Sequence, residues 1–109
     1  MAAVGVTGVG VVSPHGADAN AMFAALMRGE SAVQRIYPEL PKPAAAATAE
    51  FDARAWFTLL QLVGVDRVSQ LAVAAASLAL KDAGLEQFED PTRVGLYVGC
   101  GMGGATALE

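Results

Sequence analysis

The residues that could take part in chemistry lie mostly in a glycine-rich segment near residue 100. Cys100 is the only cysteine, and a thiol beside backbone amides can become a thiolate nucleophile. Such activation needs a base, and the only histidine, His15, lies in a predicted turn near the other end of the sequence. We therefore interpret Cys100 as a small residue at a strand end and His15 as an exposed turn residue.

The same segment contains the spacing of a dinucleotide-binding loop. The pattern G-x-G-x-x-G is formed by Gly99, Gly101 and Gly104. In nucleotide-binding proteins this loop precedes a helix, and an acidic residue follows about twenty positions later. The sequence ends at Glu109, before either feature. An earlier pair, Gly8 and Gly10, is followed by Ser13 where the third glycine should stand. Both segments therefore lack parts of the nucleotide-binding fingerprint.

Met102 stands between two glycines, which is unusual for a flexible apolar side chain. Such a residue either faces a cavity or a partner surface, or fills an ordinary gap in the core. Trp56 and Phe57 are interpreted as core or interface anchors. The charged residues Asp66, Arg67, Lys81 and Asp82 are interpreted as helix-end charges that interact with the helix dipole and solvent.

The composition is too apolar for a small independent globule. Of 109 residues, 54% are hydrophobic and 17% charged, which leaves little charge to cover a surface. The net charge is −4 and the seven basic residues are scattered, so no nucleic-acid-binding surface is expected. One cysteine excludes an internal disulfide and a cysteine-rich zinc site, and no metal is expected. No signal peptide or membrane span is predicted, and the expected location is the cytoplasm.

These residues must be positioned by alternating strands and helices. Residues 3–12 are rich in valine on both faces and predict a buried strand, which a turn at residues 13–16 ends. Asp18 is a candidate N-cap for a helix over residues 21–27 that Gly29 closes. Residues 31–50 predict an irregular connection, in which 45–51 could form a short strand. A short helix is predicted over residues 54–62.

The strongest helical pattern covers residues 66–83, with Gly84 as its C-cap. Residues 71–80 are apolar nearly all round, which is typical of a helix buried on every side. A turn over residues 85–91 then leads to a second predicted strand, 93–98. A buried helix between buried strands needs covering layers, so we expect this chain to be a fragment or the obligate partner of something larger.

Three blocks of the sequence resemble one protein family. They are residues 6–16 (V-T-G-V-G-V-V-S-P-H-G), 66–72 (D-R-V-S-Q-L-A) running to 81–85 (K-D-A-G-L), and 93–104 (R-V-G-L-Y-V-G-C-G-M-G-G). In this order and spacing they resemble the N-terminal part of β-ketoacyl-acyl-carrier-protein synthases, the elongating condensing enzymes of fatty-acid and polyketide synthesis. The resemblance covers most of the chain and weakens through residues 36–62.

The resemblance implies an α/β thiolase fold with α/β/α/β/α layers. Residues 1–109 would be a partial N-terminal ketosynthase domain, the first part of that fold's N-terminal half. The implied reaction is a decarboxylative Claisen condensation between an acyl group on a cysteine and malonyl carrier protein. The family's reactive cysteine and two histidines lie further along the polypeptide, so no catalytic residue is expected here and the chain alone is predicted to be inactive. Met102 falls where similar enzymes place an apolar residue that lines the acyl cavity.

The resemblance also implies the partners. They are acyl carrier protein, whose phosphopantetheine carries the substrate with no other bound cofactor, the remainder of the polypeptide, and a second ketosynthase-like subunit in a homodimer or heterodimer. Two alternatives remain open. The chain could belong to a non-catalytic partner subunit of the chain-length-factor type, or it could be a self-standing small α/β protein that binds an anion or nucleotide through its glycine-rich end.

Overall fold

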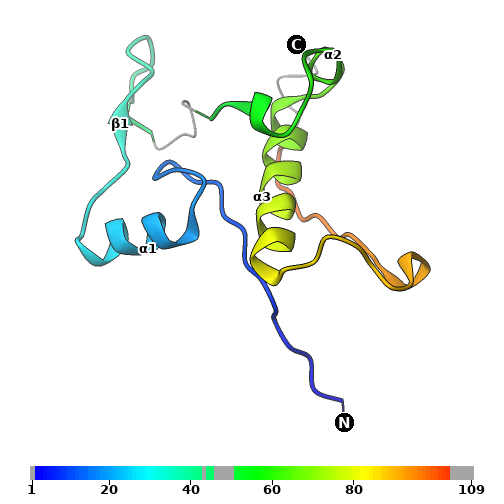
Figure 1. Cartoon of the computed structure of the whole chain (residues 1–109). Helices are drawn as coiled ribbons and strands as arrows, with labels where there is room; N and C mark the ends of the chain where they lie inside the picture. Colours follow the sequence, from blue (N-terminus) through cyan, green and yellow to red (C-terminus); the bar gives the residue numbers. More distant parts are fainter. Residues whose placement is uncertain (1, 43, 46–50, 104–109) are drawn as a thin grey trace. The chain divides into compact units, whose positions relative to one another are not determined.

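The computed structural model describes residues 2–42, 44–45 and 51–103. The chain forms two compact units, and each is described by itself. One unit is drawn from residues 1–10 and 52–109, and the other from residues 11–51. The longest helix, α3 (Arg67–Ala83), belongs to the first unit (Figure 1).

Helix α3 forms as the sequence predicts because both of its ends are capped. Asp66 is the N-cap, and its side chain accepts a hydrogen bond from the Ser69 N–H at 3.2 Å. Gly84 ends the helix in the left-handed conformation, with φ of 70°. The Leu85 N–H then donates to the Leu80 carbonyl at 3.0 Å, which completes a Schellman motif. The predicted helix over residues 66–83 is confirmed.

The N-terminal segment lies directly against α3 at two glycines (Figure 1). A Cβ atom built on Gly8 would lie 2.7 Å from the Ala83 backbone nitrogen, and closer still to the Ala79 carbonyl oxygen. A Cβ atom on Gly10 would overlap the Ala75 carbonyl oxygen and the Ala79 nitrogen. Real Cβ atoms do not approach backbone this closely, so only glycine fits at either position.

A hydrogen bond fixes the segment between these two glycines. The Val9 N–H donates to Asp82 Oδ2 at 2.9 Å, across 73 residues of sequence. Asp82 was expected to be a helix-end charge that faces solvent. Asp82 is exposed in the last turn of α3, as expected, and its carboxylate also accepts the hydrogen bond from the N-terminal segment, so the contact between segment and helix has a defined register.

The strands predicted over residues 3–12 and 93–98 are not formed in this structure. Apart from Arg93, which belongs to a 3-10 turn, both segments lie outside helices and strands, and their backbones make no ladder hydrogen bonds with other described residues. Val4 is 94% exposed and Tyr97 95% exposed. A strand exists only through pairing with a neighbour, and the part of the chain that the structure describes places none beside either segment.

The faces of α3 are only partly covered. Ala74 is the one residue of this helix that is fully buried within the described structure, whereas Val73 and Leu80 are 42% and 38% exposed. The expectation of a helix buried on every side is therefore wrong for the described residues. They supply the N-terminal segment, one short turn and Gly103 as contacts, which is too little protein to enclose a helix that is apolar all round.

Two short helical turns replace the single helix predicted over residues 54–62. They are the 3-10 turn η1 (Ala53–Ala55), which contacts α3, and helix α2 (Leu59–Leu62). Thr58 separates them because it starts a new helix with a capping box: its Oγ1 accepts the Gln61 N–H, and Gln61 Oε1 accepts the Thr58 N–H. Trp56 and Phe57, expected to be anchors, are half-buried between the two turns.

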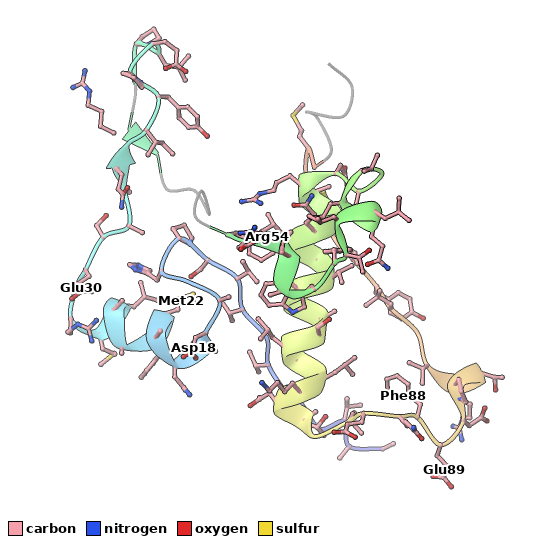
Figure 2. All side chains as sticks on the ribbon, turned by 45° about the horizontal axis from the view of Figure 1, so that its top comes forward. Asp18, Met22, Glu30, Arg54, Phe88 and Glu89 are labelled. Carbon is pink, nitrogen blue, oxygen red and sulfur yellow. The ribbon has the colours of Figure 1, made fainter. Side chains whose placement is uncertain are left out.

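The loop after α3 contains Phe88 and Glu89 (Figure 2). It leads to a second 3-10 turn, η2 (Pro91–Arg93), at the point where the strand over residues 93–98 was predicted to begin. Asp90 caps this turn by accepting the Thr92 N–H at 3.1 Å.

The second unit contains helix α1 (Ala19–Met27), which confirms the predicted N-cap Asp18 and the closure at Gly29. Figure 2 shows Asp18 at the start of α1 and Glu30 beyond its end. The unit also holds a two-residue antiparallel ladder of β1 (Gln34–Arg35) and β2 (Ala44–Ala45) within the connection predicted to be irregular. Most of the short strand predicted over residues 45–51 lies outside the described residues.

Two exposed ion pairs lower the pKa of their carboxyl groups. The hydrogen bond from the Arg28 side chain lowers the pKa of Glu30, and the Arg54 side chain followed by its backbone N–H lowers that of Asp52. A lowered carboxyl pKa adds stability above the unfolded-state pKa, and this stability is lost as the pH falls through the folded-state pKa. Because both pairs are exposed, solvent screens them and their contribution is small.

The close packing of the N-terminal segment predicts a position-dependent effect of adding one methyl group. Gly8→Ala and Gly10→Ala should each lower the free energy of unfolding by about 1–3 kcal/mol, because the new Cβ forces the segment off α3. Gly5→Ala is the matched control, since nothing lies within 4 Å of its Cβ position. Urea denaturation of the three variants measures the difference. Equal stability of all three would contradict the packing.

The Asp82 contact makes a second prediction. Asp82→Ala removes the acceptor of the Val9 N–H, so amide exchange at Val9 should accelerate and the free energy of unfolding should fall by about 0.5–1.5 kcal/mol. Glu86→Ala removes an exposed carboxylate from the loop after α3 and serves as the control for charge. Similar exchange at Val9 in both variants would show that the hydrogen bond is not formed in solution.

Candidate functional site

The described part of the glycine-rich segment forms a turn closed by a cysteine sulfur. The Gly103 N–H donates to Cys100 Sγ at 3.1 Å, so the side chain of one residue caps the backbone three residues later. Both residues are exposed. We call residues 100–103 the Cys100 turn. It is the part of the structure that carries both Cys100 and Met102.

The Cys100 turn rests on the first turn of α3. A Cβ atom on Gly103 would lie 2.7 Å from Val68 Cγ2 and 3.3 Å from Val68 Cβ, and it would overlap Cys100 Sγ. Gly103 therefore sits between the sulfur and the valine side chain with no space for a larger residue. Gly99 and Gly101 have nothing within 4 Å of their Cβ positions. The contact with α3 is thus specific to one glycine of the segment.

Met102 projects from this turn with its side chain 88% exposed. No contact of its own fixes the side chain, so its location depends on the backbone of the Cys100 turn. The expectation that it lines an acyl cavity stays a prediction. In the described structure, Met102 projects from the hydrogen-bonded turn and is not packed into a core.

Cys100 has no described group beside it that could act as a base. Its sulfur accepts a backbone hydrogen bond, which is a structural use of the side chain. His15 belongs to the other unit, where it lies in the turn between Ser13 and Gly16. The predicted turn is confirmed, but His15 is half-buried rather than exposed. The structure therefore gives no support to a Cys–His pair.

The nucleotide-binding pattern is only partly visible. Gly104, its third glycine, lies outside the described residues, and no helix begins within residues 99–103. The earlier glycines, Gly8 and Gly10, serve the close approach to α3. Their role is therefore packing, which the glycine spacing alone did not distinguish from phosphate binding.

Among the described residues, no group of three or more histidine, cysteine or acidic side chains is arranged to hold a metal ion. Within the same ranges, each helix is too short or too polar to cross a bilayer.

Sequence reasoning missed three contacts around α3: Val9 with Asp82, Gly8 and Gly10 with the alanines, and Gly103 with Val68. One of these contacts had a signal in the sequence. The spacing of the glycines at positions 8 and 10 along an extended chain is similar to the spacing of the alanines at 75, 79 and 83 along a helix. Two residues of extended chain span about 6.8 Å, close to the rise of about 6 Å over four helical residues. The sequence did not show which segments meet.

Comparison with known families gives one match over the whole chain. The model of the beta-ketoacyl synthase N-terminal domain matches residues 1–109. No solved structure matches the chain.

Several curated proteins are similar to this chain. A Streptomyces halstedii protein that carries the name polyketide beta-ketoacyl synthase 2 is 38% identical over 105 residues, 91% of this chain and 25% of that protein. The 3-oxoacyl-(acyl-carrier-protein) synthase 2 of Coxiella burnetii is 36% identical over 95% of this chain and 26% of that protein. The tetracenomycin polyketide synthase ketoacyl synthase beta subunit of Streptomyces glaucescens is 37% identical over 94% and 26%. The chain thus spans about a quarter of the length of these relatives.

Proposed function

This chain belongs to the β-ketoacyl synthase family, and we propose that it is the N-terminal portion of a condensing enzyme that joins an acyl thioester to malonyl carrier protein. The observation that carries the proposal is the match of residues 1–109 to the family's N-terminal domain. The chain covers only about a quarter of its relatives, such as 26% of the Coxiella protein. The activity therefore belongs to a longer polypeptide in this proposal.

The family implies a thiolase-like α/β fold, and the exposed surfaces of the first unit support the layered form of it. Two apolar segments make no ladder hydrogen bonds with other described residues, and α3 shows apolar side chains on open faces. These are the features of inner layers that further strands and helices would cover. In this proposal, the predicted strands over residues 3–12 and 93–98 pair with strands from the remainder of the polypeptide.

The chemistry follows from the family, and this chain contributes scaffold rather than catalytic groups. An acyl group moves from the phosphopantetheine thiol of acyl carrier protein to a cysteine sulfur that lies beyond residue 109. Decarboxylation of malonyl carrier protein releases CO₂ and leaves a carbanion, which attacks the acyl carbonyl and expels the cysteine thiolate. Two histidines, also beyond this chain, assist decarboxylation, and backbone amides stabilise the oxyanion. No bound cofactor is needed.

Cys100 is not the nucleophile in this proposal. Its sulfur is engaged by the Gly103 N–H, and the turn around it carries Met102 toward open space. We assign Met102 to the wall of the acyl pocket, where its volume would limit the length of the acyl chain. Met102 is 88% exposed within the chain, so its side chain is free for contact with other groups.

The names of the relatives support two versions of the complete protein. One is a catalytic synthase, which the similarity to a 3-oxoacyl-(acyl-carrier-protein) synthase favours, and we propose a homodimer for this version. The other is a non-catalytic subunit in a heterodimer, which the similarity to a ketoacyl synthase beta subunit favours. In both versions, the partners are acyl carrier protein and a second ketosynthase-like subunit in the cytoplasm. Fatty-acid and polyketide synthesis are both compatible with these names.

The proposal is tested on the protein expressed from its natural reading frame. Incubation with acyl carrier protein loaded with acyl and malonyl groups should release CO₂ and give a 3-oxoacyl product, detected by intact mass of the carrier. A non-catalytic subunit should do so only with its partner. A polypeptide that ends at residue 109, folds cooperatively and binds nucleotide or phosphate saturably would instead support the self-standing binding protein.

The pocket role of Met102 makes a separate prediction. Met102→Phe in the complete enzyme should shift products to shorter acyl chains, because the ring occupies more of the cavity end. Met102→Leu nearly conserves the volume and is the matched control, with an unchanged distribution expected. Mass spectrometry of the products distinguishes the two. Identical product distributions for wild type and the phenylalanine variant would remove Met102 from the pocket.

A further inference from the structure

We propose that Cys100 is a positioning residue, whose sulfur, together with Val68, fixes the backbone turn that carries Met102. This inference rests on the proposed function in one respect, the role of Met102 in setting acyl-chain length. The placement of the turn itself rests on contacts in the structure alone.

The hydrogen bond to sulfur is the internal link that closes the Cys100 turn. Cys100 Sγ accepts the Gly103 N–H at 3.1 Å, and Gly101 and Met102 lie within the loop that this bond closes. Among the described residues from 99 to 103, no backbone-to-backbone hydrogen bond competes with it. The acceptor atom at position 100 therefore contributes to the conformation of the turn.

Val68 ties the same turn to α3. Gly103 lies between Cys100 Sγ and the Val68 side chain, and its missing Cβ leaves the space that both occupy. Val68 is the second residue of α3, directly after the N-cap Asp66 and the first helical residue. The turn thus contacts the capped N-terminal end of α3.

Met102 has no comparable restraint of its own. Its side chain is 88% exposed and leaves the backbone between the two ends of the hydrogen-bonded loop. A shift of the turn would therefore move Met102 directly. The acceptor atom at position 100 therefore determines the position of Met102, and through Met102 the length of the acyl chain that the pocket accepts. Cys100 itself does not contact the acyl chain.

Five substitutions separate this role from a general effect on folding. Cys100→Ser retains a hydrogen-bond acceptor, whereas Cys100→Ala removes it and Cys100→Val replaces the volume without the acceptor. Gly103→Ala adds the Cβ that would overlap the sulfur and Val68, and Gly99→Ala is its control because nothing lies within 4 Å. All are made in the protein expressed from its natural reading frame.

The first readout needs no activity. Amide exchange at Gly103 should accelerate about three- to tenfold in Cys100→Ala and Cys100→Val, and by less than twofold in Cys100→Ser and Gly99→Ala. If Cys100→Ala is insoluble, amide exchange at Gly103 is compared between Cys100→Val and Cys100→Ser. Equal exchange at Gly103 in wild type and Cys100→Val would overturn the proposal, whatever the enzyme does.

The second readout is the product distribution. The ratio of the amount of product with the preferred acyl length to the amount with the next longer length should fall about three- to tenfold in Cys100→Val and Gly103→Ala. In Cys100→Ser this ratio should stay close to the wild-type value. If Met102→Phe changes the distribution and Cys100→Val does not, the positioning role fails while the proposed function stands. If wild type forms no condensation product with its partner present, the proposed function fails, and amide exchange alone decides the role of Cys100.

Discussion

The close approach of the N-terminal segment to α3 is the constraint on which the first unit depends. Gly8 and Gly10 place their backbones against the alanine face of the helix, and the Val9 N–H between them is satisfied by Asp82. A hydrogen bond to a carboxylate fixes the register, while the missing Cβ atoms allow the distance. Without both, an extended valine-rich segment would have no defined place on an apolar helix.

Helix α3 then serves as a common support for two glycine-rich segments. The N-terminal segment packs near its C-terminal end, and Gly103 packs against Val68 in its first turn. The caps Asp66 and Gly84 define both ends of this support. The same helix that positions the N-terminal segment therefore also positions the turn with Cys100 and Met102.

The surplus of apolar residues is consistent with membership in the β-ketoacyl synthase family. The first unit presents open apolar faces on α3 and on two extended segments, as the inner part of a larger α/β fold would before its neighbours are added. The one thiol of the chain is used as a hydrogen-bond acceptor within a turn. The sulfur therefore has a structural use within the described residues.

The sequence by itself determined the two longer helices, α1 and α3, and the family. The caps Asp18, Asp66 and Gly84 act within a few residues of the helices they end, so α1 and α3 could be predicted from local pattern. Three blocks in register were enough to identify the family.

Only the tertiary structure decided which glycines pack against α3, that Asp82 accepts the hydrogen bond of the Val9 N–H, and that Gly103 contacts Cys100 and Val68. These contacts join residues up to 73 positions apart, and no local spacing encodes a partner at that distance. The two predicted strands failed for the same reason, because a strand is defined by a neighbour that its own residues do not specify.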